Sequence, residues 1–230
     1  MDKDLLDILS RVDTPTVCNA IEVVQGKRGF AGFTRGTMVC TEPGRAVVGY
    51  AVTAQIAALA PPTEPPEVIR ARRMAYYKAM HDAPKPSVAV IEDLDYPNCI
   101  GAYWGEINTT IHKGFGMAGA LTNGVVRDLG DLPKGFPVIA GSIGPSHGFV
   151  HVRSLGQPVR VMGLEVRQED LIHADRHGAV VIPSEVIPTL AAAIGKLQAT
   201  ERLILDPARQ PGFDFATFEA AWTAFEKART

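Results

Sequence analysis

Arg127 and Asp128 stand side by side at the end of "LTNGVVRD", directly after an apolar run that predicts a strand. Gly105 and Glu106 open "GEINTTIHKGFG", which predicts a helix, and amide groups at a helix start favour anions. A guanidinium binds a carboxylate through two hydrogen bonds, and an aspartate binds Mg²⁺ or Mn²⁺ directly or through water. These groups suit a 2-oxo acid, which can chelate such a metal. Spacing alone also allows a solvated surface pair at Arg127 and Asp128.

The two segments can meet only if the helix packs back beside the strand that follows it. The rest of the chain predicts elements that would frame this edge of a sheet. Strands are expected over 46–59, 87–95, 117–124 and 136–144, several more over 157–183, and a turn or helix start over 125–128. Helices are expected over 4–10, 13–26, 66–83, 104–116, 184–205 with an interruption at Pro188, and 215–228.

Composition bounds the class of protein. The chain has 230 residues, 46% of them hydrophobic and 21% charged, which indicates one domain over 1–230 with a core over about 13–183 and a helical extension over 184–230. The net charge of -2 disfavours nucleic-acid binding. No apolar run reaches the ~20 residues of a membrane span, and the acidic start is unlike a signal peptide. We therefore expect a soluble, cytoplasmic protein that contacts no membrane.

The motifs around the charged pair resemble a known family. Gly105-Glu106, then Gly119, then "TNGVVRD" is similar to the signature of the RraA-like family, which includes class II 4-hydroxy-4-methyl-2-oxoglutarate aldolases and ribonuclease regulators. "DTPTVCNAIE", "PGRAVVGYAVTAQ" and "GLEVRQEDLIHADRHGAVVIP" agree with it. The resemblance implies an α/β fold, an αββα sandwich with stacked β layers flanked by helices. It also implies a homotrimer or hexamer with the site at a subunit boundary, and Mg²⁺ or Mn²⁺ as cofactor.

The resemblance also implies a role for each site residue. Arg127 would bind the substrate carboxylate, and Asp128 would bind the metal, at least partly through water. The amides of Gly105, Glu106 and Ile107 would hold the pyruvate-like end, and Glu106 could orient a metal-bound water. The implied reaction is retro-aldol cleavage of a 4-hydroxy-2-oxo acid to pyruvate, oxaloacetate decarboxylation, or both. Each would pass through a metal-stabilised pyruvate enolate.

Two other functions stay open at this point. One is a non-catalytic binding protein that modulates a ribonuclease, although relatives of that kind lack the aspartate that this chain has at 128. The other is a Schiff-base aldolase, which needs a lysine in an apolar strand. None of the lysines, for example Lys78, Lys113 or Lys134, lies in such a run.

Several residues do not follow the aldolase pattern. Asn123 stands where many aldolases carry an aspartate, so a second acid is missing there. His147 and His151 could be metal ligands if they were helical, since they would then share a face, but the glycines and proline around them favour a loop. A substrate contact is a further possibility for these two histidines. Glu201 is a candidate for an acidic group donated by a neighbouring subunit. The arginines of "RARR", 70–73, are interpreted as a solvated helix face.

Overall fold

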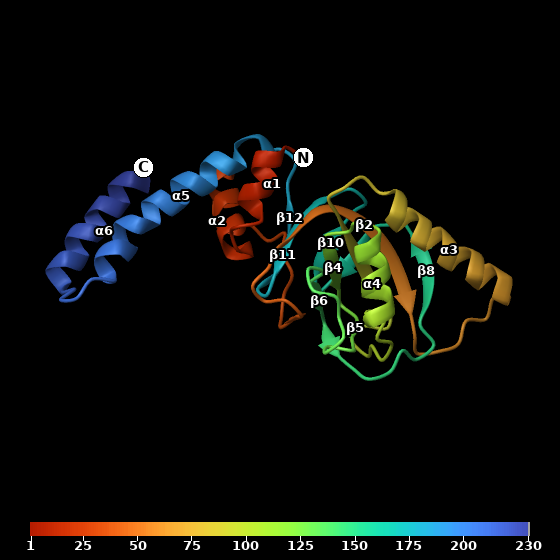
Figure 1. Ribbon diagram of the computed structural model, residues 1–230. Helices are drawn as coiled ribbons and strands as arrows, with labels where there is room; N and C mark the ends of the chain where they lie inside the picture. Colours follow the sequence, from red (N-terminus) through yellow and green to blue (C-terminus); the bar gives the residue numbers. More distant parts are fainter. Residues whose placement is uncertain (230) are drawn as a thin grey trace.

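The computed structural model describes residues 1–229 as a mixed α/β fold, as expected (Figure 1). Its helices are α1 (Lys3–Leu9), α2 (Thr14–Gln25), α3 (Pro66–Asp82), α4 (Glu106–Gly114), α5 (Ile187–Ala208) and α6 (Phe215–Arg229). Its strands are β1 (Val39–Cys40), β2 (Val47–Ala57), β3 (Ser87–Asp93), β4 (Gly119–Thr122), β5 (Val125–Val126), β6 (Val138–Ala140), β7 (Ser142–Ile143), β8 (His151–Leu155), β9 (Val159–Val161), β10 (Leu164–Val166), β11 (Leu171–Asp175) and β12 (Gly178–Ile182).

The main sheet has the strand order β1-β6-β4-β3-β2-β11-β12, and β8 pairs with the far half of β2. Strands β2, β3, β4 and β6 run parallel, so their carboxyl ends lie at one edge. In such sheets, ligands bind beyond the carboxyl ends of the strands. The loops that follow these four strands therefore decide what the protein can bind.

Layers of helix and strand cover the two faces of this sheet. On one face, a core forms between the sheet, α3 and α4, and it includes Tyr76, Met80 and Trp104. On the other face, the β9–β10 hairpin packs its valines and Leu164 against β3, β4 and β6. A third core joins α1, α2 and α5 to β11 and β12. The stacked β layers and flanking helices that the sequence predicts are confirmed.

Local sequence explains most of the helix ends. The Oδ1 of Asp13 accepts a hydrogen bond from the amide of Thr16 at 2.9 Å and caps α2, and Gly26 ends the helix with a φ of 65°. The predicted interruption at Pro188 is wrong, because this proline lies in the first turn of α5. A proline there breaks no helical hydrogen bond, since the first amides of a helix have no partner within it.

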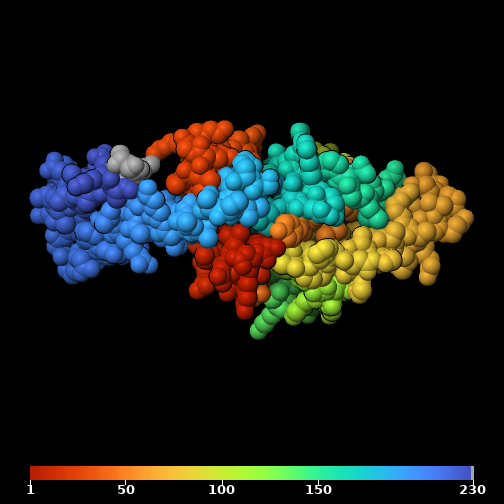
Figure 2. All heavy atoms as spheres, turned by 90° about the horizontal axis from the view of Figure 1, so that it is seen from above, coloured from red at the N-terminus to blue at the C-terminus, as the bar shows by residue number. Residues whose placement is uncertain are grey.

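The two last helices form a hairpin that projects from the rest of the molecule (Figures 1 and 2). Helix α6 packs along α5, and its aromatic residues Phe215, Phe218, Trp222 and Phe225 form a continuous row of ring contacts. Phe215 and Trp222 remain exposed. Across residues 1–229, no helix combines the length and apolar character needed to cross a bilayer.

Two buried histidines make the core sensitive to acid. The Nδ1 of His112 donates to the carbonyl of Asn108, and its Nε2 accepts from the Tyr76 hydroxyl, both at 2.6 Å. Burial lowers the pKa of His112 to about 4 from its ordinary value of 6.5. Burial also lowers the pKa of His173, which bonds to Thr14 and to the carbonyl of Leu9. Both imidazoles are therefore neutral in the folded protein.

The free energy of unfolding should fall as the pH drops from about 6.5 to about 4. Over that range the unfolded chain binds protons that the folded chain does not, and His112 alone accounts for a loss on the order of 3 kcal/mol. Urea unfolding at a series of pH values measures this slope. A His112→Gln variant should have a clearly shallower slope, although His173 still contributes. An unchanged slope in that variant would contradict the assignment to His112.

Candidate functional site

The loops at the carboxyl edge of the parallel strands are tied to one another through β5. Val125 and Val126 pair with Ser142 and Ile143 as a two-stranded parallel sheet, so the predicted turn or helix start at these two residues is wrong. Val126 also forms an isolated bridge with Trp104, and the amide of Arg127 donates to the carbonyl of Trp104 at 2.9 Å. The segment that opens α4 and the segment that carries Arg127 and Asp128 are therefore adjacent, as the sequence predicts.

Gly105 lies at the point of closest approach between these two segments. It precedes the first residue of α4 in an extended conformation. A Cβ atom at this position would stand 2.4 Å from Oδ2 of Asp128 and 2.8 Å from Nε of Arg127. Real contacts of this kind are essentially never that short, so only glycine lets both side chains lie against the helix start.

Asp128 has a backbone conformation that is uncommon for a residue with a side chain. Its φ is 55°, in the left-handed region, and its carbonyl accepts from the amide of Asp131 at 2.9 Å. Oδ2 of Asp128 accepts from the amide of Glu106 at 3.1 Å. The sharp turn thus directs the carboxylate onto the start of α4. Such conformations gather at functional sites, where the surrounding structure holds them in place.

Arg127 has an unused hydrogen-bond donor. Its Nε lies 3.4 Å from Oδ2 of Asp128, yet it is buried and forms no hydrogen bond with the described residues. The amides of Ile107 and Asn108, in the first turn of α4, also form none within residues 1–229. The amide of Glu106 is engaged by Asp128, and the side chain of Glu106 is exposed. Together, the guanidinium and the open amides could receive an anion.

The oxygen atoms of Asp128 suit a hard divalent cation whose remaining ligands are water or substrate oxygens. In the described part of the chain, no three His, Cys, Asp or Glu side chains gather into a closed metal centre. Asp128 is about one-third exposed, and only one of its two oxygens is engaged by Glu106. Mg²⁺ is commonly bound through one or two carboxylates, with water and substrate oxygens completing its shell. The residues present therefore fit such an ion.

Asn123 forms hydrogen bonds within the fold, which differs from the role of an active-site acid. Its Oδ1 accepts from the amide of Asp93 at 2.7 Å, and its Nδ2 donates to the carbonyl of Asp93 at 3.0 Å. Both contacts are buried and join the ends of β3 and β4. An ionised aspartate has no donor for the carbonyl. This pairing gives a structural reason for an amide at position 123.

A groove of about 510 Å³ runs from Arg127 along the space between α3, α4 and the start of β8. We call it the side groove, and it is lined among others by Arg73, Tyr77, Ile107, Arg127, His147 and His151. His147 lies in the loop before β8, and His151 is the first residue of that strand, so the two are not on a helix. The loop prediction is confirmed for His147 and is wrong for His151, which opens a strand, and both histidines line the groove that reaches Arg127.

The arginines at 70–73 differ from the predicted solvated face in one respect. Arg70 and Arg73 are exposed, but Arg72 is half-buried and donates to Oε1 of Glu64 at 3.0 Å and to the carbonyl of Val152 at 3.1 Å. The orientation of Arg73 toward the side groove was missed. Its signal in the sequence is the four-residue spacing of Ile69, Arg73 and Tyr77, which places all three on one helical face.

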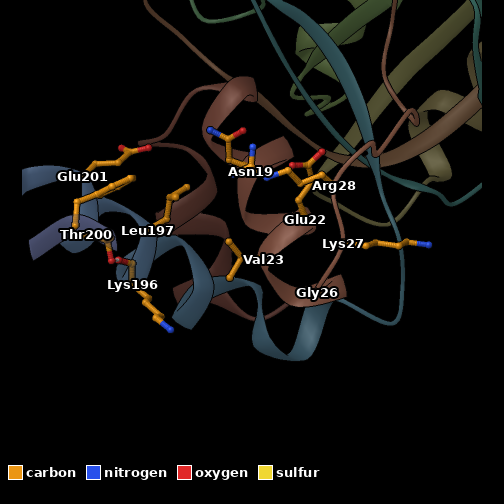
Figure 3. A pocket seen from close by; sticks show the side chains of 11 residues that line it. Asn19, Glu22, Val23, Gly26, Lys27, Arg28, Lys196, Leu197, Thr200 and Glu201 are labelled. Atoms are coloured by element: carbon orange, nitrogen blue, oxygen red, sulfur yellow. Dashed lines mark hydrogen bonds between the residues drawn. The ribbon is translucent and has the colours of Figure 1, made fainter. Parts of the chain in front are cut away.

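A larger hollow of about 660 Å³ lies at the other end of the molecule, between α2 and the α5–α6 hairpin (Figure 3). Glu201 borders it on α5 (Figure 3), whereas β5, which leads into Arg127 and Asp128, lies in the other half of the molecule (Figure 1). Its polar groups are partly used within the fold, since Oε1 of Glu22 accepts from the amides of Gly29 and Phe30. Arg127 and Asp128, the main residues predicted to carry the chemistry, line no part of this hollow, whereas Glu201 does.

Known proteins include sequences that are similar to this chain. A sequence model of the RraA-like family, described as Aldolase/RraA, matches residues 14–181. A Halalkalibacterium halodurans protein named "Putative 4-hydroxy-4-methyl-2-oxoglutarate aldolase" is 27% identical over 53% of this chain and 58% of its own length. Protein DlpA of Legionella pneumophila is 26% identical over 64% of this chain and 25% of its own. The chain thus spans less than two thirds of these curated relatives.

A solved structure supports the fold independently. Streptomyces coelicolor RraAS2, described as an unusual member of the RNase ES inhibitor RraA family, superimposes with a TM-score of 0.67. The alignment covers 88% of this chain and 96% of that one, at 22% sequence identity. At this identity the likeness concerns the fold.

Proposed function

Since the chain belongs to the RraA-like family, which comprises aldolases as well as RraA proteins, we propose that it is a divalent-metal-dependent lyase acting on 2-oxo acids. The observation that carries this proposal is the packing of Arg127 and Asp128 against Gly105 at the start of α4. It combines a guanidinium nitrogen that forms no hydrogen bond with the described residues, open amides and a carboxylate within one small site.

Each residue of the site has a separate role in binding the substrate. Arg127 binds the carboxylate of the 2-oxo acid with its guanidinium, which also balances negative charge during the reaction. The open amides of Ile107 and Asn108 orient the same end of the molecule. When the bond between C3 and C4 breaks, its electron pair moves toward the keto group and leaves an enolate of pyruvate. In a 4-hydroxy acid the hydroxyl proton passes to solvent and a carbonyl compound leaves, and in oxaloacetate CO₂ leaves. Protonation of the enolate at C3 by solvent then gives pyruvate.

Asp128 is the side chain that would hold the metal, and Glu106 could orient a water molecule beside it. Bound Mg²⁺ or Mn²⁺ would supply Lewis-acid stabilisation of the negative charge that develops on the keto oxygen. The left-handed conformation of Asp128 and its hydrogen bond from Glu106 fix the carboxylate in place before the ion arrives. Such preorganisation reduces the reorganisation that the reaction requires.

We also propose that the protein assembles as a homotrimer or hexamer. The resemblance to the family implies this, and the projecting α5–α6 hairpin, with Phe215 and Trp222 exposed, offers apolar surface for a neighbouring copy. Size-exclusion chromatography with light scattering measures the assembly. A monomer at working concentration would contradict this part of the proposal.

The lyase proposal is tested by measuring pyruvate release. Purified protein with Mg²⁺ is incubated with oxaloacetate and with a panel of 4-hydroxy-2-oxo acids, including 4-hydroxy-4-methyl-2-oxoglutarate. We expect pyruvate from at least one substrate at a rate well above that of Mg²⁺ alone. If no member of the panel yields pyruvate above the protein-free control, the proposed activity is wrong.

A further inference from the structure

The side groove continues well beyond the residues that would bind a 2-oxo acid. Its volume of about 510 Å³ is in the range of pockets that enclose drug-sized ligands. A four-carbon acid held at Arg127 would occupy only the end of it. The remaining length is bordered by side chains that the proposed reaction does not use.

The far wall of the groove is cationic. Arg73 forms no ion pair with any described residue, whereas Oε1 of Glu64 faces Arg72 at 3.0 Å and Arg153 at 3.6 Å. No Asp or Glu lines the groove among residues 1–229. In the part of the chain that the structure describes, no carboxylate pairs with the guanidinium of Arg73, which lines the same groove as Arg127.

The histidines of this wall have different hydrogen-bonding states. Nδ1 of His151 donates to the carbonyl of Phe149 at 2.8 Å, and Nη1 of Arg153 lies 3.4 Å from its Nε2. Both ring nitrogens of His151 are therefore engaged by neighbouring groups of the fold. Nδ1 of His147 donates to the carbonyl of Gly148 at 2.7 Å, which leaves its Nε2 for a ligand.

The middle of the groove is bordered by apolar side chains, and hydrogen bonds link its walls. Ile107 and Phe149 border it with more than half of each residue's surface exposed. The hydroxyl of Tyr77 donates to Oδ1 of Asn108 at 2.6 Å, and Nδ2 of Asn108 donates to the carbonyl of Tyr103 at 2.7 Å. The first of these bonds joins α3 to α4. The end of the groove at Arg73 and the end at Arg127 are therefore linked through hydrogen-bonded elements.

We propose that the side groove binds the distal half of an extended 2-oxo dicarboxylic acid, with Arg73 and His147 receiving its second carboxylate. This rests on the proposed function in one respect, that Arg127 binds the 2-oxo acid end. The apolar walls contact the carbon chain between the two carboxylates. Arg73 thus determines specificity for a substrate longer than oxaloacetate.

Calorimetric binding tests the assignment without requiring turnover. The probes are 2-oxoglutarate, 2-oxoadipate, 2-oxopimelate and 2-oxosuberate in Mg²⁺ buffer, each paired with the 2-oxo monocarboxylate of equal chain length. We expect at least one longer dicarboxylate to bind about tenfold more tightly than its paired monocarboxylate, as one charge-assisted hydrogen bond to an arginine allows. Arg73→Met should remove that preference.

Arg70→Met is the matched control, because it removes the same charge from the same helix at an exposed position outside the groove. It should retain the preference. No preference for any dicarboxylate in the wild-type protein, or an equal loss in both variants, would overturn the assignment. Pyruvate release from oxaloacetate is measured on the same preparation. A preference for the dicarboxylate without turnover would contradict the proposed lyase activity and support the assignment of the groove. Turnover without that preference would support the lyase activity and contradict the assignment of the groove.

Discussion

Gly105→Ala should lower the rate of pyruvate release by about 100-fold or more while the protein stays folded. The new Cβ would stand 2.4 Å from Oδ2 of Asp128 and 2.8 Å from Nε of Arg127, so both side chains must move away from the helix start. A displacement of about 1 Å in a reacting group can cost about 10²-fold in rate. The clash is with movable side-chain ends, so the backbone can persist.

Gly114→Ala is the control for this substitution. Gly114 ends the same helix, and a Cβ there would meet nothing within 4 Å. Its turnover should equal that of the wild type. Steady-state rates and thermal unfolding are measured for both variants. If Gly105→Ala keeps full activity, the close packing at this glycine is unnecessary, and the site described above is wrong.

Asp128→Asn should lower kcat by about 10³-fold, because the several kcal/mol that a bound cation contributes would be lost. Asparagine tolerates the left-handed conformation at a φ of 55°, and its carbonyl oxygen can still accept from the amide of Glu106. The variant therefore changes the charge and keeps the shape, which an alanine would not.

Asp131→Asn removes a carboxylate from the same turn, at an exposed position whose amide donates to the carbonyl of Asp128. Its activity should remain near that of the wild type. Activity is compared over a range of Mg²⁺ concentrations, so that weaker binding and lost chemistry are separated. If Asp128→Asn were as active as Asp131→Asn, Asp128 would have no special part in the reaction.

Local signals in the sequence predict much of the fold. The apolar run at 46–59 becomes β2, and Asp13 and Gly26 bound α2, because capping and strand formation depend on residues close in sequence. Val125 and Val126 were predicted as a turn or helix start, because their partners, Ser142 and Ile143, lie far along the chain. Pairing at that distance cannot be recognised from two valines.

The site could be predicted only in part, because local sequence patterns specify the elements that carry it but not how they pack. Helix and strand patterns indicated that Gly105 and the Arg127-Asp128 pair would meet at the sheet edge if the helix packed back beside its strand, and the structure places them in contact. The residue type at position 128 does not by itself predict the left-handed turn. The direction of Arg73 depends on how α3 packs beside α4, which a single helix pattern does not specify.

Metal removal tests the central claim most directly. Wild-type protein is assayed for pyruvate release from oxaloacetate in three states: with Mg²⁺, after treatment with excess EDTA, and after Mg²⁺ is restored. We predict that EDTA reduces the rate to that of the protein-free control and that Mg²⁺ restores it, because Asp128 then again holds the ion beside Arg127. A rate that EDTA leaves unchanged would contradict the metal-dependent mechanism.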